Sequence, residues 1–277
     1  MVSDWIGTIR AAFTLVLLAG WTALLLPVQI IAVLLHLPIA RIVPGLYHRG
    51  NCQLIGIDVR RTGVSPIDPP ALYVCNHASY LDIVVLSTLL DASFVAKSEV
   101  AGWPLFGLLA KLVNTIFVER RPSRSGAHRN EMRERLEAGR SLILFPEGTS
   151  SDGNRVLPFN STFFAIVEEP INGKPIPVQP ITLAYTRYNN LPMSRRERPY
   201  LTWYGDTAMV GHLWRLLTIG RATVEVRFHP PVTIDAFGSR KALAAACGQS
   251  VAAGLSRLLS GRGERSDAVA AAVPRRA

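Results

Sequence analysis

Hydrophobic residues fill the N-terminal part of the chain almost without interruption. The thirty positions between Arg10 and Arg41 contain no Asp, Glu, Lys or Arg. As an α-helix with a rise of ~1.5 Å per residue, this segment is about 45 Å long, whereas the hydrocarbon core of a bilayer is roughly 30 Å thick. Pro27 lies near its middle and lacks a backbone N–H, so we expect the helix to kink or break there.

Two membrane arrangements agree with this pattern. The segment can form one tilted span, or two shorter helices that make a hairpin dipping into one leaflet. A buried core helix is the alternative outside a membrane. Positive charge is concentrated on the C-terminal side of the segment, at Arg41, Arg49, Arg60 and Arg61, which places the rest of the chain in the cytoplasm.

From Ala71 onward, short β-rich runs alternate with segments of helical pattern. The predicted strands are Ala71–Cys75, Ser93–Ala96, Thr115–Glu119, Ser141–Phe145, Pro177–Tyr185, Tyr200–Tyr204 and Thr223–Phe228. The predicted helices are Leu81–Leu90, Trp103–Val113, His128–Ala138, Phe163–Glu168 and Lys241–Leu259. The alternation indicates the α/β class, with a mixed central sheet flanked by helices and an N-terminal membrane helix or helical hairpin. We expect an anchoring segment at residues 1–45, one domain at 46–260 and a flexible tail at 261–277.

Charge and cysteine content narrow the range of partners. A formal net charge of +10 favours nucleic acid, an anionic membrane surface or phosphate-bearing molecules. The sequence has no zinc-type Cys/His spacing and no helix-turn-helix or RNA-binding signature, so no nucleic-acid partner is predicted. Three widely separated cysteines argue against a disulfide framework and favour a reducing compartment. Cys75 precedes Asn76 and His77 but ends an apolar strand run, so we interpret it as a small buried residue rather than a nucleophile.

The first candidate site is the segment Asn76–Asp82, between a predicted strand and a predicted helix. His77 can accept a proton near neutral pH, and Asp82 can hold the imidazole in one tautomer. Five residues on a continuous helix leave two side chains about 140° apart, so the pair can meet only if His77 lies in the turn before the helix. Ser79 and Asp82 also form an S-x-x-D pattern, which by itself predicts a helix cap. The two interpretations are compatible.

Two further segments carry candidate chemistry. Phe145–Ser150 follows an apolar strand and contains Glu147, Gly148 and Thr149, which offer an acceptor, a flexible backbone and a donor for a polyol or phosphate group. The strand Thr115–Glu119 is followed by Arg120 and Arg121, whose guanidinium groups suit phosphate oxygens. An ordinary turn and a solvated strand end are the respective alternatives.

Together these segments resemble the glycerophospholipid acyltransferase family, in particular its bacterial 1-acylglycerol-3-phosphate acyltransferases. The His-x4-Asp pattern is matched by His77 and Asp82. The later blocks are matched, in the same order, by Ile116–Arg120, Phe145–Thr149 and Ile176–Ile181.

The resemblance implies acyl transfer from acyl-CoA or acyl carrier protein to a lysophospholipid, without an acyl-enzyme intermediate. His77 would be the base and Asp82 its orienting residue. The acceptor would be bound by Arg120, Glu147, Gly148 and Thr149. No metal or redox cofactor is expected. The predicted reaction forms phosphatidic acid from 1-acyl-sn-glycerol-3-phosphate at the cell inner membrane, with the catalytic domain on the cytoplasmic face and against an anionic membrane surface.

Some positions depart from the family pattern. Asn114 stands where a glycine often occurs, and Asn160 and Thr162 stand where a lysine and a glycine are common. The run Ser150–Phe159 also resembles the branch that acylates lyso-ornithine lipid, which is the alternative acceptor. A hydrolase and a non-catalytic peripheral membrane protein are the other classes; the sequence lacks the G-x-S-x-G element of one common hydrolase route.

Overall fold

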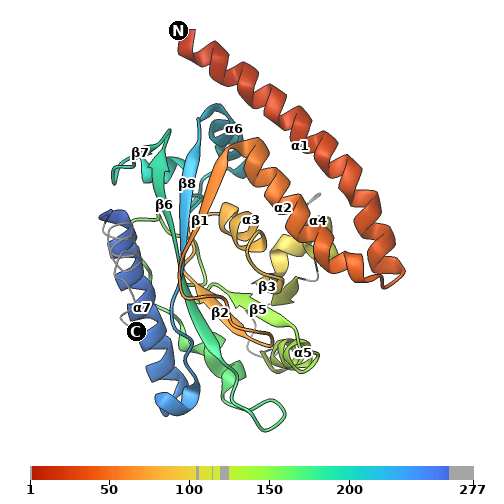
Figure 1. Cartoon of the computed structure of the whole chain (residues 1–277), viewed down its shortest axis with the longest axis vertical. Coiled ribbons are helices and arrows are strands. Elements are labelled where there is room, and N and C mark those ends of the chain that lie inside the picture. Colours follow the sequence, from red (N-terminus) through yellow and green to blue (C-terminus); the bar gives the residue numbers. More distant parts are fainter. Residues whose placement is uncertain (1, 104–105, 114, 119–124, 262–277) are drawn as a thin grey trace, which may run out of the picture.

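A mixed β-sheet forms the centre of the molecule (Figure 1). The computed structural model describes residues 2–103, 106–113, 115–118 and 125–261. Within these residues the sheet has the order β1-β8-β6-β2-β5-β3-β4, with β7 paired to β6. The strands are β1 Ile57–Gly63, β2 Leu72–Cys75, β3 Ala92–Lys97, β4 Ile116–Val118, β5 Ser141–Leu144, β6 Val178–Tyr188, β7 Leu191–Pro192 and β8 Ala222–Phe228.

Strand direction brings the candidate segments to one edge of the sheet. Strand β2 pairs in parallel with both β5 and β6, and β3 pairs in parallel with β5 and β4. The carboxyl ends of these strands therefore share an edge, and the loops that follow β2 and β5 lie there as neighbours. Strand β8 is antiparallel to β6 and parallel to β1, which makes the sheet mixed.

Helices cover both faces of the sheet. The α-helices are α1 Val2–Leu34, α2 Ile42–Ile55, α3 Leu81–Ser87, α4 Phe106–Leu112, α5 Ser125–Glu137, α6 Met209–Thr218 and α7 Arg240–Leu259. Short 3-10 turns occupy Pro38–Arg41, Ser98–Gly102, Ser161–Val167, Arg198–Tyr200 and Ile234–Ala236. Helix α7 lies on one face, whereas α1, α2, α3 and α6 lie over the other (Figure 1).

Successive residues of the central strands pack alternately into two hydrophobic cores, one on each face of the sheet. Tyr73 and Cys75 of β2 pack with α2, α3 and α6, whereas Leu72 and Val74 of the same strand pack with α5 and α7. The two buried faces explain why β2 and β5 are buried at every position. On α5, Met132 and Leu136 are buried against the second core, as their four-residue spacing predicts.

The fold class predicted from the sequence is confirmed, but individual elements differ. The expected strand Tyr200–Tyr204 is wrong: a 3-10 turn ends at Tyr200, and the N–H of Trp203 donates to the carbonyl of Ala78 at 2.8 Å instead of joining the sheet. Strand β1 was missed because charged residues interrupt its apolar pattern, and α2 and α6 were also missed. The boundary expected at residue 45 falls within α2, and residues 262–277 of the expected tail lie outside the described residues.

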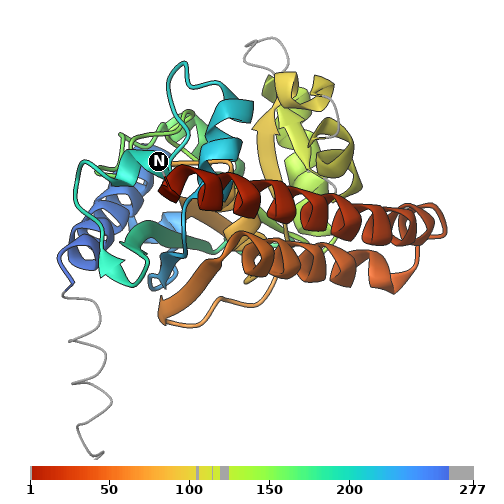
Figure 2. The ribbon, with the colours of Figure 1, turned by 90° about the horizontal axis from the view of Figure 1, so that it is seen from above.

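Helix α1 passes through Pro27 without a break, so of the kink or break expected there the break is wrong. Side-chain contacts on both sides of the proline hold the helix in place. Trp21 Nε1 donates to the carbonyl of Tyr47 at 3.1 Å, and Gln29 Nε2 donates to the carbonyl of Leu112 at 2.9 Å. The chain turns after residue 34 and returns as α2, so a helical hairpin exists, with its turn later than expected (Figure 2).

Candidate active site

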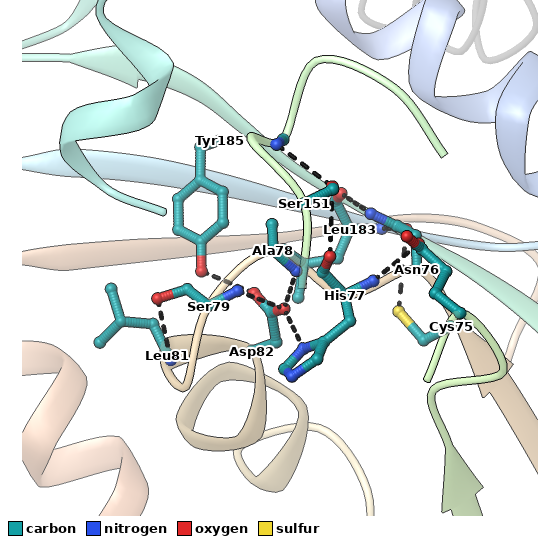
Figure 3. A network of polar contacts seen from close by, with 12 residues as sticks. Cys75, Asn76, His77, Ala78, Ser79, Leu81, Asp82, Ser151, Leu183 and Tyr185 are labelled. Atoms are coloured by element: carbon teal, nitrogen blue, oxygen red, sulfur yellow. Dashed lines mark hydrogen bonds and ion pairs between the residues drawn. The ribbon is translucent and has the colours of Figure 1, made fainter. Parts of the chain in front are cut away.

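His77 and Asp82 meet at the carboxyl end of β2. His77 lies in the loop between β2 and α3, and Asp82 lies in the first turn of α3. The Nδ1 atom of His77 is 2.8 Å from Asp82 Oδ2 (Figure 3). The geometric condition set by the spacing, with the histidine in the turn before the helix, is therefore confirmed.

The Asp82 carboxylate is fully buried and receives several hydrogen bonds. Its Oδ2 atom accepts from the N–H groups of Ala78 and Ser79, at 2.6 and 2.9 Å, besides contacting His77. Its Oδ1 atom accepts from the hydroxyl of Tyr185 at 2.6 Å. The bond from the N–H of Ser79 is the backward contact of a capping box, but the N–H of Asp82 donates to the backbone carbonyl of Ser79 at 3.0 Å and not to its hydroxyl. The contact between His77 and Asp82 is confirmed as geometry, whereas the cap predicted from the S-x-x-D pattern is formed only in its backward half.

The orientation of the His77 imidazole ring is fixed by its neighbours, but the ring remains partly exposed to solvent. Its side chain is 20% exposed, and its ring stacks on Phe145 with centroids 4.1 Å apart and planes 17° apart. When Nδ1–H donates to the carboxylate, the lone pair of the neutral ring is on Nε2. This arrangement leaves Nε2 to accept a proton from a substrate group.

Three contacts fix the backbone of the loop that carries His77. Asn76 exchanges two hydrogen bonds with the backbone of Leu183 on β6, Nδ2 to O and N to Oδ1, both at 2.9 Å. The N–H of Ser151 donates to the carbonyl of His77 at 2.9 Å. The N–H of Trp203 donates to the carbonyl of Ala78. The loop is thus attached to the sheet, to the segment after β5 and to the segment after β6.

Glu147 lies in the turn after β5 and binds the backbone of the same loop through its carboxylate. Its Oε1 atom accepts from the N–H of His77 at 3.0 Å, and its Oε2 atom accepts from the N–H of Leu157 at 3.1 Å. Burial raises the pKa of Glu147 to about 8, against the lowering effect of these two bonds, and the Asp82 carboxylate raises the pKa further. The structure shows this bracing contact; the predicted contact of Glu147 with an acceptor stays a prediction.

The other predicted binding residues have different surroundings. Gly148 has a φ of 67°, a left-handed conformation that favours glycine. Thr149 is exposed next to it. Arg120 lies outside the described residues. The roles of these three residues toward an acceptor stay predictions.

The environment of Cys75 makes its thiol a poor nucleophile. It is fully buried at the end of β2, and burial, then the negative charges of Asp82 and Glu147, raise the pKa of its thiol well above the ordinary value. A thiol with a raised pKa is a poor nucleophile. The interpretation of Cys75 as a buried strand residue is confirmed.

Sequence reasoning missed Tyr185 as a site residue, and it named Phe145 only within a strand and the block Phe145–Thr149, without its stacking on His77. Tyr185 stands in the apolar run of β6, on the same face as Ile181 and Leu183. A buried tyrosine needs a partner for its hydroxyl, and that need was the available signal. The partner could not be named from the sequence, because β6 lies about a hundred residues after α3 in the chain.

The arrangement can accept a proton from a hydroxyl and return it to a leaving group. The histidine is buried on one side, exposed at Nε2 and oriented by a carboxylate, as general base catalysis requires. Within the described ranges, His, Cys, Asp and Glu side chains do not gather in any group of three or more that could hold a metal ion.

Comparison with known proteins identifies the family. Residues 56–184 match the family model described as Acyltransferase. The chain is 40% identical, over 93% of its own length and 89% of the relative, to lyso-ornithine lipid O-acyltransferase of Rhizobium meliloti. It is 31% identical, over 63% of its length and 64% of the relative, to 1-acyl-sn-glycerol-3-phosphate acyltransferase of Neisseria gonorrhoeae.

A solved structure has the same fold. The crystal structure of the 1-acyl-sn-glycerophosphate acyltransferase PlsC from Thermotoga maritima aligns with a TM-score of 0.66, at 20% identity, over 93% of this chain and 96% of that one. The chain belongs to the acyltransferase family and is an O-acyltransferase, as its sequence blocks predicted.

Proposed function

We propose that this enzyme transfers a fatty acyl group from a carrier thioester to the free hydroxyl of lyso-ornithine lipid. The observation that carries the chemistry is the 2.8 Å contact between His77 Nδ1 and Asp82 Oδ2, which leaves Nε2 accessible. His77 is the general base, and Asp82 holds its tautomer and stabilises the imidazolium that forms.

In the proposed reaction, Nε2 of His77 removes the proton of the acceptor hydroxyl while the oxygen attacks the thioester carbonyl carbon. The tetrahedral intermediate then collapses, the carbon–sulfur bond breaks, and the thiolate takes the proton from the imidazolium. The products are an ester and a free thiol. The thioester is already an activated acyl group, so the proposed reaction needs no metal or redox cofactor. Holding the thioester beside the activated hydroxyl supplies much of the rate enhancement.

The choice of acceptor is supported by the relatives and by one loop. The relative from Rhizobium meliloti is named for lyso-ornithine lipid and aligns over nearly the whole chain. At the position where the phosphatidate-forming family often has a lysine, Asn160 Oδ1 accepts from the N–H of Thr162 at 2.9 Å and caps a 3-10 turn. A side chain used as a cap supplies no positive charge for a phosphate. Lysophosphatidate is the second candidate, favoured by the four family blocks.

The test is acyl transfer by purified protein in mixed micelles. Labelled acyl-CoA and labelled acyl carrier protein are each offered with lyso-ornithine lipid or lysophosphatidate. Both donors are tested because both carry the thioester on a phosphopantetheine group. We expect product from lyso-ornithine lipid and no product from His77→Ala. Product from lysophosphatidate alone would overturn the proposed acceptor. Full activity of a folded His77→Ala variant would overturn the mechanism, and free fatty acid released without an acceptor would indicate a hydrolase.

We propose further that α1 lies in the plane of the membrane interface instead of crossing the bilayer. By length and composition α1 could span a membrane, but contacts near both of its ends attach it to the domain. Arg10 donates to the carbonyls of Ile55 and Leu217, at 2.9 and 3.3 Å, and Gln29 donates to that of Leu112. An upright span would break the contacts at one end.

The outward side of the hairpin is apolar. Trp5, Ile9, Phe13 and Val16 recur at helical spacing and are 63–72% exposed. Helix α2 adds the exposed side chains of Ile42 and Leu46. An apolar surface of this extent fits the acyl-chain region of one leaflet. The basic chain then faces anionic headgroups on the cytoplasmic side of the inner membrane.

The topology can be tested with a membrane-impermeant maleimide. The native cysteines Cys52, Cys75 and Cys247 are all buried, so background labelling is low. We expect Ser3→Cys to react only in inside-out vesicles. Asp235→Cys, in the folded domain outside the hairpin, should do the same. Reaction of Ser3→Cys only in right-side-out vesicles would establish a single span.

A further inference from the structure

The hydroxyl of Tyr185 reaches the Asp82 carboxylate from the central sheet. Tyr185 lies on β6 and is 1% exposed, and its hydroxyl is 2.6 Å from Asp82 Oδ1 (Figure 3). Burial, and then the Asp82 carboxylate, raise the pKa of Tyr185 well above its ordinary value, so the hydroxyl stays protonated. It is therefore a permanent hydrogen-bond donor to this carboxylate.

The two oxygens of Asp82 have different partners. Oδ2 accepts from the N–H groups of Ala78 and Ser79 and contacts His77, whereas Oδ1 accepts from Tyr185. A carboxylate can rotate about its Cβ–Cγ bond, which exchanges or tilts the two oxygens. A donor on Oδ1 opposes this rotation and keeps Oδ2 directed at Nδ1 of His77.

A bulge in β6 lies next to Tyr185. Tyr185 pairs with Val224 of β8, but Thr223 pairs with Arg187, so Thr186 is an additional residue on β6. Such bulges bend a strand and re-aim its side chains, and they are frequent beside active sites.

Arg198 binds the backbone at this bulge. It is 4% exposed, its Nε atom donates to the carbonyl of Tyr185 at 3.2 Å, and its Nη2 atom donates to that of Met193 at 3.1 Å. Its Nη1 atom donates to Asn154 Oδ1. The position of Tyr185 is therefore fixed by its strand and by a buried guanidinium.

We propose that Tyr185 is a positioning residue for acyl transfer, whose hydroxyl holds the Asp82 carboxylate in the rotation that orients His77. The inference rests on the proposed function, in which His77 is the base. Tyr185 does not reach the substrate in this proposal; it acts only through Asp82.

The test compares Tyr185→Phe with Tyr73→Phe. Tyr73 is a matched control, because it is 3% exposed, lies on the neighbouring strand β2 and packs in the same core. Its hydroxyl donates to the carbonyl of Ile67 at 2.8 Å and not to the site. Each substitution removes one buried hydroxyl and one hydrogen bond.

We expect Tyr185→Phe to lower kcat roughly tenfold, as for the loss of a hydrogen bond to a charged group, with little change in the acceptor KM. Tyr73→Phe should keep kcat within about twofold, since an ordinary buried hydrogen bond affects stability. In an Asp82→Asn background, Tyr185→Phe should have little additional effect on kcat, because the two residues act as one unit.

The pH profile gives a second readout. The ionisable groups that contact Asp82 or interact with its charge are His77, Tyr185, Cys75 and Glu147, and Tyr80 interacts with Tyr185. Without the hydroxyl, the negative charge of Asp82 loses one hydrogen-bond donor and is less stabilised. The acidic limb of the pH–rate profile should therefore move to higher pH in Tyr185→Phe. Glu147 is present in both proteins, so its titration does not produce the difference.

The outcomes separate this inference from the proposed function. If His77→Ala is inactive but Tyr185→Phe keeps the wild-type kcat and pH profile, Tyr185 is structural and the inference fails. The inference also fails if Tyr185→Phe lowers kcat equally with and without Asp82→Asn. If the wild-type protein transfers no acyl group, or a folded His77→Ala is fully active, the proposed function itself fails.

Discussion

Glu147 Oε1 accepts a hydrogen bond from the backbone N–H of His77 at 3.0 Å, although the two residues are 70 positions apart in the chain. The contact joins the loop after β2 to the turn after β5, and these strands are parallel neighbours in the sheet. Glu147 therefore positions the candidate base through its backbone, while Asp82 positions it through its ring.

Asp82→Asn should abolish most of the activity and keep the fold. An asparagine can direct its carbonyl oxygen to the N–H groups of Ala78 and Ser79 and its amide group to Tyr185. It cannot stabilise an imidazolium as a carboxylate does. We expect kcat to fall by roughly a hundredfold or more, with a retained cooperative thermal transition. Activity near the wild-type level in micelle assays would remove Asp82 from the mechanism.

Cys75→Ala should retain acyl transfer. The thiol is fully buried and its pKa is raised, so it cannot supply a nucleophile. We expect kcat within about twofold of wild type and a loss of stability of about 1 kcal/mol from the smaller side chain. The check is single-turnover transfer with a labelled donor, followed by denaturation. A labelled protein band that disappears in Cys75→Ala would instead establish an acyl-cysteine intermediate.

Glu147→Gln should change how stability depends on pH. The pKa of Glu147 is raised from 4.5 to about 8 in the folded protein, so the folded state binds the proton more tightly than the unfolded state. The stabilisation from that proton is fully present below pH 4.5 and is lost as the pH rises through about 8. The glutamine side chain of the variant does not titrate, so the variant lacks this pH-dependent stabilisation.

The measurement for Glu147 is the thermal midpoint of wild type and variant between pH 5 and about 8.5, a range that covers most of the interval between the two pKa values. The midpoint of wild type minus that of Glu147→Gln should fall steadily across it. A constant difference would show that Glu147 titrates at its ordinary value.

Gly148→Ala should destabilise the turn after β5. The φ of Gly148 is 67°, and its added Cβ would lie 3.7 Å from Phe163, which is an ordinary contact. The cost is therefore in the backbone, and we expect a loss of about 1–2 kcal/mol in urea unfolding. Gly211→Ala, in helix α6 with nothing within 4 Å of its added Cβ, is the control and should be neutral or slightly stabilising. Equal effects at both positions would contradict the role of the left-handed conformation.

Much of the architecture could be predicted from local pattern. Apolar runs at β2, β5 and β6 are long enough and bounded clearly enough to be recognised as buried strands. Strand β1 could not be recognised this way, because Arg60 and Arg61 interrupt its apolar pattern. The aromatic residues at Tyr200–Tyr204 favoured a strand, but the backbone N–H of Trp203 donates to the loop that carries His77.

The sequence by itself determined the chemistry of the first site segment. His77 and Asp82 are five positions apart around a helix start, so a local turn is enough to bring them together. The sequence also determined that residues 11–40 carry no Asp, Glu, Lys or Arg and are mostly apolar. Both properties depend only on residues that are close together in the chain, so the amino-acid sequence alone is enough to predict them.

Only the tertiary structure decided which distant groups complete the site and how α1 lies. Tyr185, Glu147 and Phe145 reach the pair from β6 and from the turn after β5, because parallel strands place their ends at one edge of the sheet. Helix α1 stays continuous through Pro27, and Trp21 and Gln29 on either side of the proline are bound to other elements. Such contacts join residues that are far apart in the chain, and local propensity carries no information about their partners.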